Sequence, residues 1–427
     1  MASKALPESR GSLFDMVRFT LDPDGFFAAV HRRHGDVFKL RLLREEWVAI
    51  AHPDAVREVF SHGPEQVDSG AANQALSPAL GTRNLLLLDG EEHLHRRRIV
   101  LPPFHGDRMR AYERTIRAAA AEQIAAWPLH EPVAALPRMQ ELTFAVIMRC
   151  VFGVQDDEQV GALGDALRDM LAWLTDMRRV LFFFVVGPQR LESVPAFRRQ
   201  LARVDREIIA EIGRRRALGD LDERDDILSM LIQAVDEHGE SLSDLELRDE
   251  LMTLLTAGHE TTATLLSWAI HDLSRDQASQ ERLAGEGGAF TDAVITEALR
   301  LHPPTGGVVR RLREPLTIAG YELPQGTDVL PITLLVHRRA DVYSRPWRFD
   351  PTRFLEVRPP AGAWFPFGGS VRRCIGASFA QFEAKIVLEE LIGALRFRPV
   401  ERRPERTSRR AIVLVPSKGA KVIAERR

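Results

Sequence analysis

FGGSVRRCIG, at residues 367–376, is the most informative stretch of this sequence. A cysteine follows a glycine-rich, arginine-bearing loop and precedes a predicted helix, about 374–395, whose apolar residues recur at helical spacing. The free N–H groups and the dipole of a helix start favour negative charge, so a thiolate at Cys374 would be stabilised there. A lone cysteine is more often buried and inert. Here the glycines permit close approach of the backbone to a flat ligand, Phe367 can shield the sulfur and Arg372 offers a cation, so the loop suits a metal thiolate.

A long helix is predicted earlier in the chain, from about Leu245 to Ser274. It is apolar on nearly every side through its middle, which indicates that it lies deep inside the protein. A polar patch at residues 258–262, Gly-His-Glu-Thr-Thr, interrupts it. An apolar helix does not bury a carboxylate and hydroxyls without cause, because an unpaired buried charge is costly. We therefore expect polar chemistry at this patch.

Two other chemistries can be tested on these motifs. The pair His259-Glu260 begins like a zinc-protease helix, but the residue four positions after the histidine is Ala263, so the second zinc ligand is missing. The run at residues 368–372 lacks the final glycine of a nucleophile elbow. Zinc protease and hydrolase are both excluded, and His259 is interpreted as a wall residue.

A third motif joins a predicted helix, about Phe290 to Leu301, to residues 351–354. Glu297 and Arg300 lie three positions apart on that helix and can pair, although this spacing alone is weak evidence. The helix ends at His302-Pro303-Pro304, because proline cannot continue it. The order of these motifs, followed by the cysteine loop, is more informative than any one of them.

The cysteine loop resembles that of the cytochrome P-450 family, whose pattern is Phe, two residues, Gly, one residue, Arg, one residue, Cys, one residue, Gly. Phe367, Arg372, Cys374 and Gly376 match it, and Ser370 stands in place of the first glycine. The resemblance implies that Cys374 ligates the iron of haem b and that Phe367, Arg372 and Gly376 lie against the cofactor. The substitution at Ser370 concerns the local turn.

The polar patch resembles the oxygen-activation motif of the same family: Ala, Gly, any residue, acid, Thr. By resemblance, Thr261 would hydrogen-bond iron-bound dioxygen and Glu260 would help to deliver protons. Ala257 and Gly258 would leave space for the haem and its oxygen. The resemblance also implies a buried, structural ion-pair triad under the haem, formed by Glu297, Arg300 and Arg353.

A haem brings two carboxylates, which need cations when they are buried. Residues 89–97 resemble the family's propionate-binding helix, in which an arginine follows a histidine by four positions. For Arg310, the neighbouring Arg311 gives an equally basic alternative register. Arg96 and Arg98 are interpreted as a solvated basic face. The residues assigned to the propionates by resemblance are His93, Arg97, Arg310 and Arg372.

Helical patterning dominates from about Asp89 to Leu301, and strand-like stretches lie towards the two ends, at Val37–Ala51, Leu316–Leu334 and Ile412–Val415. We predict one mainly α domain, residues 1–427, with a small β part in which both termini share a sheet. The resemblance implies the cytochrome P-450 fold, with haem between the long buried central helix and the cysteine-loop helix. The predicted boundaries are a β-rich part at about 30–65, 315–335 and 395–427, and a helical body at about 89–301 and 374–395.

The composition of the whole chain restricts its class. With 427 residues and 45% hydrophobic residues, it can bury a large core. Fifty-eight basic and 60 acidic residues leave a net charge of −2, which indicates neither nucleic acid nor an anionic membrane as partner. Two cysteines are too few for a disulfide framework. There is no signal-peptide pattern and no apolar run near the ~20 residues of a membrane span, so we expect a soluble, cytoplasmic protein.

The segments that would face a substrate, by resemblance, are mostly apolar. This favours a hydrophobic substrate, such as a fatty acid, terpenoid, steroid or polyketide-like molecule, with insertion of one oxygen atom from O2 into a C–H bond. Too few residues follow the cysteine for a fused reductase, so electrons are expected from a separate ferredoxin or flavodoxin that docks on a basic surface around Arg373 and Arg96. The substrate-facing segments are Ser69–Leu87, Met177–Val186, the helix before Ala257, Thr305–Val309 and the strand near Ile412.

Two alternative functions stay open from the sequence. The first is a peroxide-driven or isomerising haem enzyme of the same fold, for which loss of the acid and the threonine is the usual mark. Glu260 and Thr261 are both present. The second is a non-catalytic haem-binding or sensor protein, for which an intact oxygen motif would be unnecessary.

Overall fold

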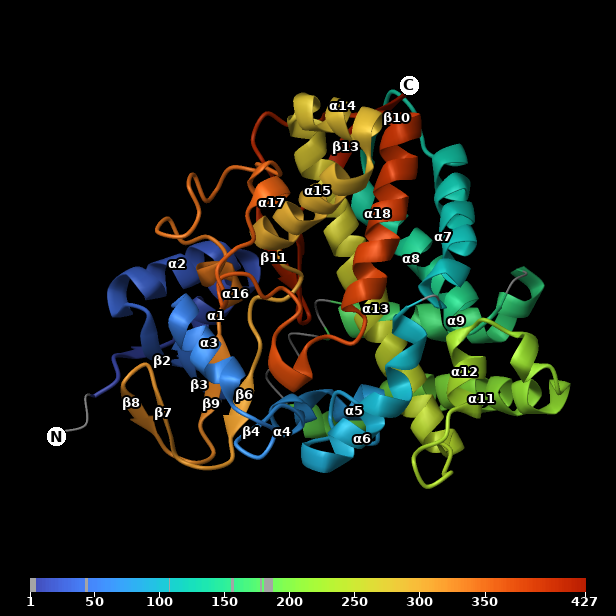
Figure 1. The fold of residues 1–427 in the computed structure, drawn as a ribbon, viewed down its shortest axis with the longest axis horizontal. Coiled ribbons are helices and arrows are strands. Elements are labelled where there is room, and N and C mark those ends of the chain that lie inside the picture. Colours follow the sequence, from blue (N-terminus) through green and yellow to red (C-terminus); the bar gives the residue numbers. More distant parts are fainter. Residues whose placement is uncertain (1–4, 43–44, 107, 155–156, 177–178, 180–186) are drawn as a thin grey trace.

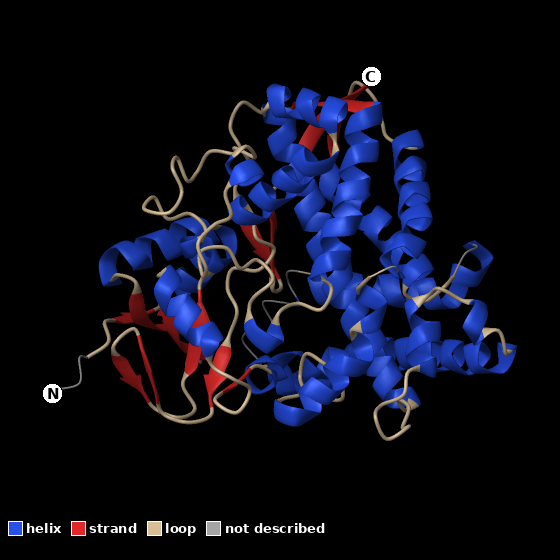
Figure 2. Ribbon diagram, viewed as in Figure 1, coloured by secondary structure: helices blue, strands red, loops and turns tan. Residues whose placement is uncertain are grey.

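A helical body and a smaller group of strands make up the molecule (Figure 1). The computed structural model describes residues 5–427 except 43–44, 107, 155–156, 177–178 and 180–186. Figure 2 shows most strands at the lower left, a small group near the C-terminus and further strand ribbon in the middle, with helices making up most of the rest. Across the described part of the chain, no helix is long and apolar enough to cross a membrane.

The helices include one element much longer than the others, α13, which runs through the middle of the helical body (Figure 1). The bounds of the α-helices are α1 Leu13–Leu21, α2 Pro23–His34, α3 Pro53–Ser61, α4 Gly70–Asn73, α5 Ser77–Leu80, α6 Gly90–Val100, α7 Arg108–Ala125, α8 Ala135–Cys150, α9 Asp157–Thr175, α11 Pro195–Leu218, α12 Ile227–Gln233, α13 Asp244–Arg275, α14 Gln277–Glu286, α15 Gly288–Leu301, α16 Thr333–Val336, α17 Arg353–Glu356 and α18 Ala377–Ala394.

The strands are short and, within the described residues, form one larger sheet and three small ones. The larger sheet has the order β1-β2-β3-β9-β6-β4; the small ones are β10-β13-β5, β11-β12 and β7-β8. The bounds of the strands are β1 Glu8–Arg10, β2 Val37–Leu42, β3 Glu45–Ile50, β4 Val67–Asp68, β5 Pro132–Ala134, β6 Arg310–Leu312, β7 Leu316–Ile318, β8 Tyr321–Leu323, β9 Asp328–Pro331, β10 Leu395–Pro399, β11 Thr407–Arg410, β12 Val413–Pro416 and β13 Lys421–Arg426.

The prediction that both termini share one sheet is wrong. Strand β3 pairs in parallel with β9, with Val48 opposite Val329, so the N-terminal strands join strands from the later middle of the chain. The C-terminal strand β13 pairs instead with β10 and with β5, which lies within the region predicted to be helical. Period-two patterning indicates that a segment is a strand, but its partner depends on tertiary packing.

The long central helix agrees closely with its prediction. It begins with a capping box, in which the side chain of Ser243 accepts the N–H of Glu246 while the Glu246 side chain accepts the N–H of Ser243. The end of the predicted strand 316–334 is wrong, because residues 333–336 form α16. The predicted helix start at Cys374 is also wrong: a 3-10 turn at residues 370–372 precedes it, and α18 begins only after Gly376.

The main hydrophobic core lies around α13, which packs against α8, α15 and α18. Two smaller clusters of buried side chains lie among the strands and the N-terminal helices. The cysteine loop leads directly into α18, and α18 packs against α13. In Figure 1 the chain before α18 lies between the strands and the central helix. This arrangement brings the loop and the polar patch of α13 to the same part of the molecule.

Candidate active site

The cysteine loop is held by backbone hydrogen bonds across its own turn. The N–H of Cys374 donates to the carbonyl of Phe367 at 2.9 Å, and the N–H of Arg373 donates to the carbonyl of Ser370 at 3.0 Å. Gly369 is required by space, because a Cβ at this position would lie 2.5 Å from the ring of Phe60. The loop therefore has little freedom to move away from its neighbours.

Cys374 is an exposed residue, although many protein atoms surround its thiol. Its exposed surface therefore faces inward, not the outer surface of the molecule. Burial raises the pKa of this thiol. The N–H of Gly376 and the charges of Arg97 and Arg373 act in the opposite direction and favour the thiolate. An accessible sulfur that faces an internal space, with an N–H donor and two cations near it, fits a metal ligand better than an inert core cysteine.

One face of α13 is open although most of the helix is buried. Ala257 is exposed, while Leu254, Gly258 and Thr261 are partly exposed. Ala257, Gly258 and Thr261 follow Leu254 by three, four and seven positions. This spacing places all four residues on one side of the helix. The open face contains the small residues and the threonine of the oxygen motif, so space exists where the sequence predicted it.

The two polar residues of the oxygen motif have different surroundings. The hydroxyl of Thr261 donates to the carbonyl of Ala257 at 2.6 Å and stays partly exposed on the open face. Glu260 is 5% exposed and accepts a hydrogen bond of 2.6 Å from the side-chain amide of Gln140 in α8. Arg410 of β11 lies 3.7 Å from the other carboxylate oxygen. Neither Gln140 nor Arg410 was predicted, because only the packing of α8 and β11 brings them to α13.

A cluster of basic side chains lies near the cysteine loop. His93 of α6 is 2% exposed, and its pKa is lowered to about 3, first by burial and then by the charges of Arg372 and Arg97. Arg310 adds to the same effect, while Asp89 opposes it. His93 Nδ1 is buried and has no hydrogen-bond partner within the described structure. The four basic residues predicted by resemblance are therefore brought together.

Asp89 is the acidic partner in this cluster. Its carboxylate accepts an ion-paired hydrogen bond from Arg372 and backbone N–H groups of Ser69, Gly70 and Ala71 at 2.7 to 3.0 Å. Arg372 also donates to the carbonyl of Leu85 at 3.3 Å. Asp89 is one carboxylate among several cations, and the buried His93 Nδ1 beside it has no partner within the described residues. This excess of positive charge fits a ligand that brings two further carboxylates. The residues present thus fit a haem.

The structure resolves the register between Arg310 and Arg311. Arg310 is 5% exposed and lies beside the cysteine loop, where its guanidinium donates to the carbonyl of Gly369 at 3.3 Å. Arg311 instead forms a two-bond pair with Asp328, at 2.7 and 2.8 Å, and is directed away from the loop. Arg310 is therefore the arginine available to the site.

The interpretation of Arg96 as a solvated residue is wrong. Arg96 is 6% exposed and pairs with Glu246 and Glu250 of α13, and it also donates to the carbonyl of Arg83 at 2.6 Å. The sequence of α6 alone does not show that this face is buried, because the helix that covers it, α13, lies about 150 residues later in the chain. Arg98, by contrast, is 62% exposed, as expected.

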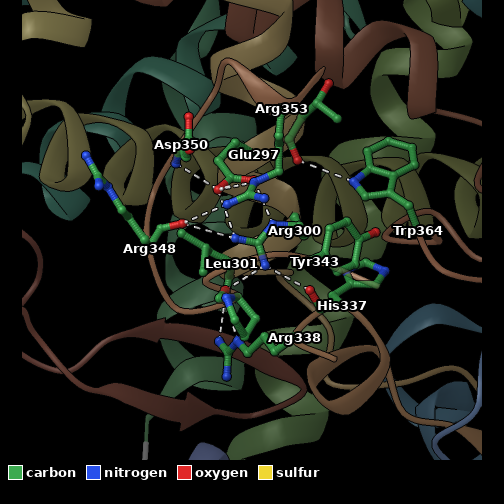
Figure 3. Close-up of polar contacts among 12 residues, drawn as sticks. Glu297, Arg300, Leu301, His337, Arg338, Tyr343, Arg348, Asp350, Arg353 and Trp364 are labelled. Atoms are coloured by element: carbon green, nitrogen blue, oxygen red, sulfur yellow. Dashed lines mark hydrogen bonds and ion pairs between the residues drawn. The ribbon is translucent and has the colours of Figure 1, made fainter. Parts of the chain in front are cut away.

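The predicted ion-pair triad is present (Figure 3). Arg300 and Glu297, both fully buried, form two hydrogen bonds of 2.6 and 2.8 Å, and Arg353 donates to Glu297 at 3.1 Å. Arg300 also donates to the carbonyls of His337 and Pro346 at 2.9 and 2.8 Å. The triad thus connects α15 and α17 to the loops before the cysteine.

Ser370 adopts a left-handed backbone conformation, with φ of 59°. This region is easy for glycine and strained for other residues. The glycine expected from the family pattern is therefore replaced at a position where the backbone requires glycine-like φ. Gly368, two positions before Ser370, has φ of 68°. Two residues of this turn therefore adopt the left-handed conformation.

The substrate-facing segments can be examined only in part. Residues 305–309 are all partly exposed, and Ile412, at the tip of the β11-β12 hairpin, is 53% exposed. Apart from Arg179, the segment Met177–Val186 lies outside the described residues. Apart from Thr305, residues 305–309 and Ile412 are glycine or apolar, and they are accessible.

Comparison with known proteins places the chain in a family. A family model described as Cytochrome P450 matches residues 10–424. Cytochrome P450 135B1 of Mycobacterium tuberculosis, a putative protein by its name, is 38% identical over 93% of this chain and 86% of its own length. Cytochrome P450 137 of the same organism, also putative, is 37% identical over 92% and 83%. The chain belongs to the cytochrome P450 family.

A solved structure agrees with this fold. The retinoic acid bound cyanobacterial CYP120A1 superposes over 100% of both chains with a TM-score of 0.85 at 24% identity. The mainly α fold with a small β part is thereby confirmed. The family consists of haem monooxygenases with a cysteine-thiolate iron ligand, so this chain is a monooxygenase of the oxidoreductase class.

Proposed function

We propose that this chain inserts one oxygen atom from O2 into a C–H bond of a hydrophobic small molecule, with haem b ligated by Cys374. The observation that carries the proposal is the accessible thiol of Cys374 beside a cationic cluster, with the oxygen motif on the open face of α13. Haem held by a thiolate supplies the activation of dioxygen. The protein supplies binding, orientation and protons.

The residues that would hold the haem have separate roles. Cys374 provides the iron ligand, and the N–H of Gly376 stabilises its charge. Phe367 and Gly376 would lie against the cofactor beside the cysteine, and Ala257 and Gly258 would leave space for the cofactor and its oxygen. The residues that would bind the haem carboxylates are His93, Arg97, Arg310 and Arg372.

Glu260 and Thr261 would handle protons at the oxygen site. Thr261 presents its hydroxyl on the open face of α13, and Glu260 lies next to it in the sequence with its carboxylate turned towards α8. General acids of this kind act through hydrogen-bond contact with the reacting group or with one water. The presence of both residues favours oxygen-dependent turnover over a peroxide-driven or isomerising enzyme.

The substrate is proposed to be hydrophobic, of the fatty acid, terpenoid, steroid or polyketide type. The open face of α13 and residues 305–309 offer mainly small and apolar side chains, and Ile412 adds another. The cyanobacterial structural relative is described as bound to retinoic acid, itself a hydrophobic molecule. This likeness supports the class of substrate, not its identity.

Electrons are proposed to come from a separate cytoplasmic ferredoxin or flavodoxin. Arg373 is exposed directly beside the cysteine, and Arg98 is 62% exposed on α6. A basic surface next to the cysteine loop suits an acidic partner and makes association dependent on ionic strength. Electron transfer that is insensitive to salt would count against this partner.

The proposal is tested by a spin-state screen followed by product analysis. Apolar compounds that shift the ferric spin state are incubated with the holoenzyme, O2, NAD(P)H, a ferredoxin and its reductase. The proposal predicts substrate-dependent NAD(P)H consumption and a product with one added oxygen, labelled when 18O2 is used. Turnover with peroxide but none with this electron-transfer system would favour the peroxide-driven alternative. Haem binding without any product would favour the non-catalytic one.

A further inference from the structure

Gln140 of α8 contacts two consecutive residues of α13. Its side-chain amide donates to Glu260 Oε2 at 2.6 Å, and its backbone carbonyl lies 3.1 Å from His259 Nε2. Thr143, on the same helix, donates to the carbonyl of His259 at 3.1 Å. One residue of α8 therefore fixes the orientation of both the histidine ring and the carboxylate.

These contacts determine which nitrogen of His259 carries the proton. A backbone carbonyl can only accept, so Nε2 of His259 is the protonated nitrogen and Nδ1 is an acceptor. Nδ1 lies 3.8 Å from Glu260 Oε2. Nδ1 of His259 and Oε1 of Glu260 are both buried and lack a hydrogen-bond partner in the described structure. Buried acceptors without a donor cost free energy, and one added proton relieves that cost.

His259 and Glu260 are 7% and 5% exposed, so neighbouring side chains cover most of the pair. Burial lowers the pKa of His259. The charge of Glu260 and the hydrogen bond to the carbonyl of Gln140 act in the opposite direction. On the α8 side, the ring of Phe144 meets His259 edge-on at 6.0 Å, and Arg168 of α9 covers that ring at 4.5 Å. On the β11 side, Arg410 lies 3.7 Å from Glu260 and is itself 37% exposed. Arg410 is therefore the neighbour through which the pair lies nearest to solvent among these contacts.

We propose that His259 and Glu260 jointly hold one proton for the oxygen reaction, with Gln140 as the positioning residue of the pair. This inference rests on the proposed role of Glu260 in proton delivery. A hydronium ion from solvent gives one proton to the pair and leaves as water; the pair passes a proton to the hydroxyl oxygen of Thr261, which releases its own hydroxyl proton on the open face of α13. His259 then returns to its neutral form and Glu260 to its carboxylate. One proton moves and no electron does.

The first test compares His259→Gln with His238→Gln in the complete enzyme. His238 is 76% exposed and serves as the control. In H259Q the fraction of NAD(P)H that yields product should fall about tenfold, less than the roughly 10²- to 10⁴-fold contribution of a complete proton-transferring group, because Glu260 remains. Its solvent isotope effect should rise. Turnover with peroxide should fall less, because that oxidant brings its own protons. H259Q that matches H238Q in all three measurements overturns the inference.

The second test observes the histidine directly in the diamagnetic reduced carbon monoxide complex. With ring-15N histidine, the signal that disappears in H259Q belongs to His259. We expect the tautomer with Nε2 protonated and Nδ1 free, and a shift of the Nδ1 signal in Gln140→Met, which removes the donor to Glu260 and retains the backbone carbonyl. A neutral ring with Nδ1 protonated and Nε2 free in the wild-type protein, or an unchanged signal in Q140M, contradicts the arrangement.

Glu260→Gln separates this inference from the proposed function. If E260Q loses coupling while H259Q retains it, the carboxylate delivers protons without the histidine, and only the shared-proton inference fails. If E260Q retains wild-type coupling, the proposed role of Glu260 fails and the inference fails with it. Loss of coupling in both variants, with H238Q unaffected, supports both.

Discussion

Single residues carry measurable strain at the cysteine loop, and Ser370 is the clearest case. A non-glycine residue in the left-handed region costs about 1–2 kcal/mol, partly offset because glycine loses ~0.5–1 kcal/mol more backbone entropy on folding. Ser370→Gly should therefore stabilise the holoenzyme by about 0.5 kcal/mol, measured by denaturant unfolding. Ser370→Ala should bring no gain, because alanine meets the same strain. A less stable S370G would show that the serine hydroxyl makes a bond worth more than the strain.

Glu383 of α18 provides a pH-dependent prediction. It is 2% exposed, Oε1 has no partner in the described structure, and burial raises its pKa to about 8. A pKa raised on folding means that the folded protein binds the Glu383 proton more tightly than the unfolded chain does. The contribution of Glu383 to the free energy of unfolding is therefore complete below about pH 4.5 and is lost as the pH rises through 8. At about 1.4 kcal/mol per pH unit, the loss is on the order of 5 kcal/mol.

Glu383→Gln removes this titration, since an amide stays neutral. Thermal unfolding from pH 5 to pH 9 should show E383Q melting above the wild type at pH 9, with the difference shrinking towards pH 5. The control, Glu131→Gln, changes an exposed residue and should follow the wild-type curve. Parallel curves for E383Q and the wild type would show that the carboxyl is solvated in the protein.

At the scale of elements, the triad ties α15 and α17 together. Removing one partner of a buried ion pair leaves an uncompensated charge and costs about 3–5 kcal/mol. Glu297→Gln should therefore lower the free energy of unfolding by several times as much as Glu286→Gln, which affects the half-exposed pair with Arg282. Equal effects in denaturant unfolding would contradict a structural role for the triad.

The elements also show what sequence could and could not predict. The limits of α13 were predictable because a continuous apolar pattern and a serine cap are local signals. The triad was predictable only through the family resemblance, which the motif order supported. Gln140 and Asp89 were not, because their roles depend on which helix or loop packs beside them. Arg96 was misjudged for the same reason, since its two acidic partners lie about 150 residues later on α13.

At the scale of the whole molecule, the fold brings the ends of several separate motifs to one internal space. The cysteine loop, the open face of α13 and the basic end of α6 come from different thirds of the chain. Their convergence explains why the motif order was informative while each motif alone was weak. The sheet partners could not be predicted, because pairing between distant strands is set by the closed fold.

The central claim is that Cys374 ligates the haem iron, and the carbon monoxide difference spectrum of the reduced protein tests it most directly. Cys374 and Cys150 are the cysteines of the sequence, and Cys150 is 2% exposed in α8. The wild type and Cys150→Ser should both give the red-shifted Soret band of a thiolate-ligated complex. Cys374→His should lose that band and give the shorter-wavelength band of an imidazole-ligated haem. A Cys374→His variant that retains the thiolate band would contradict the assignment.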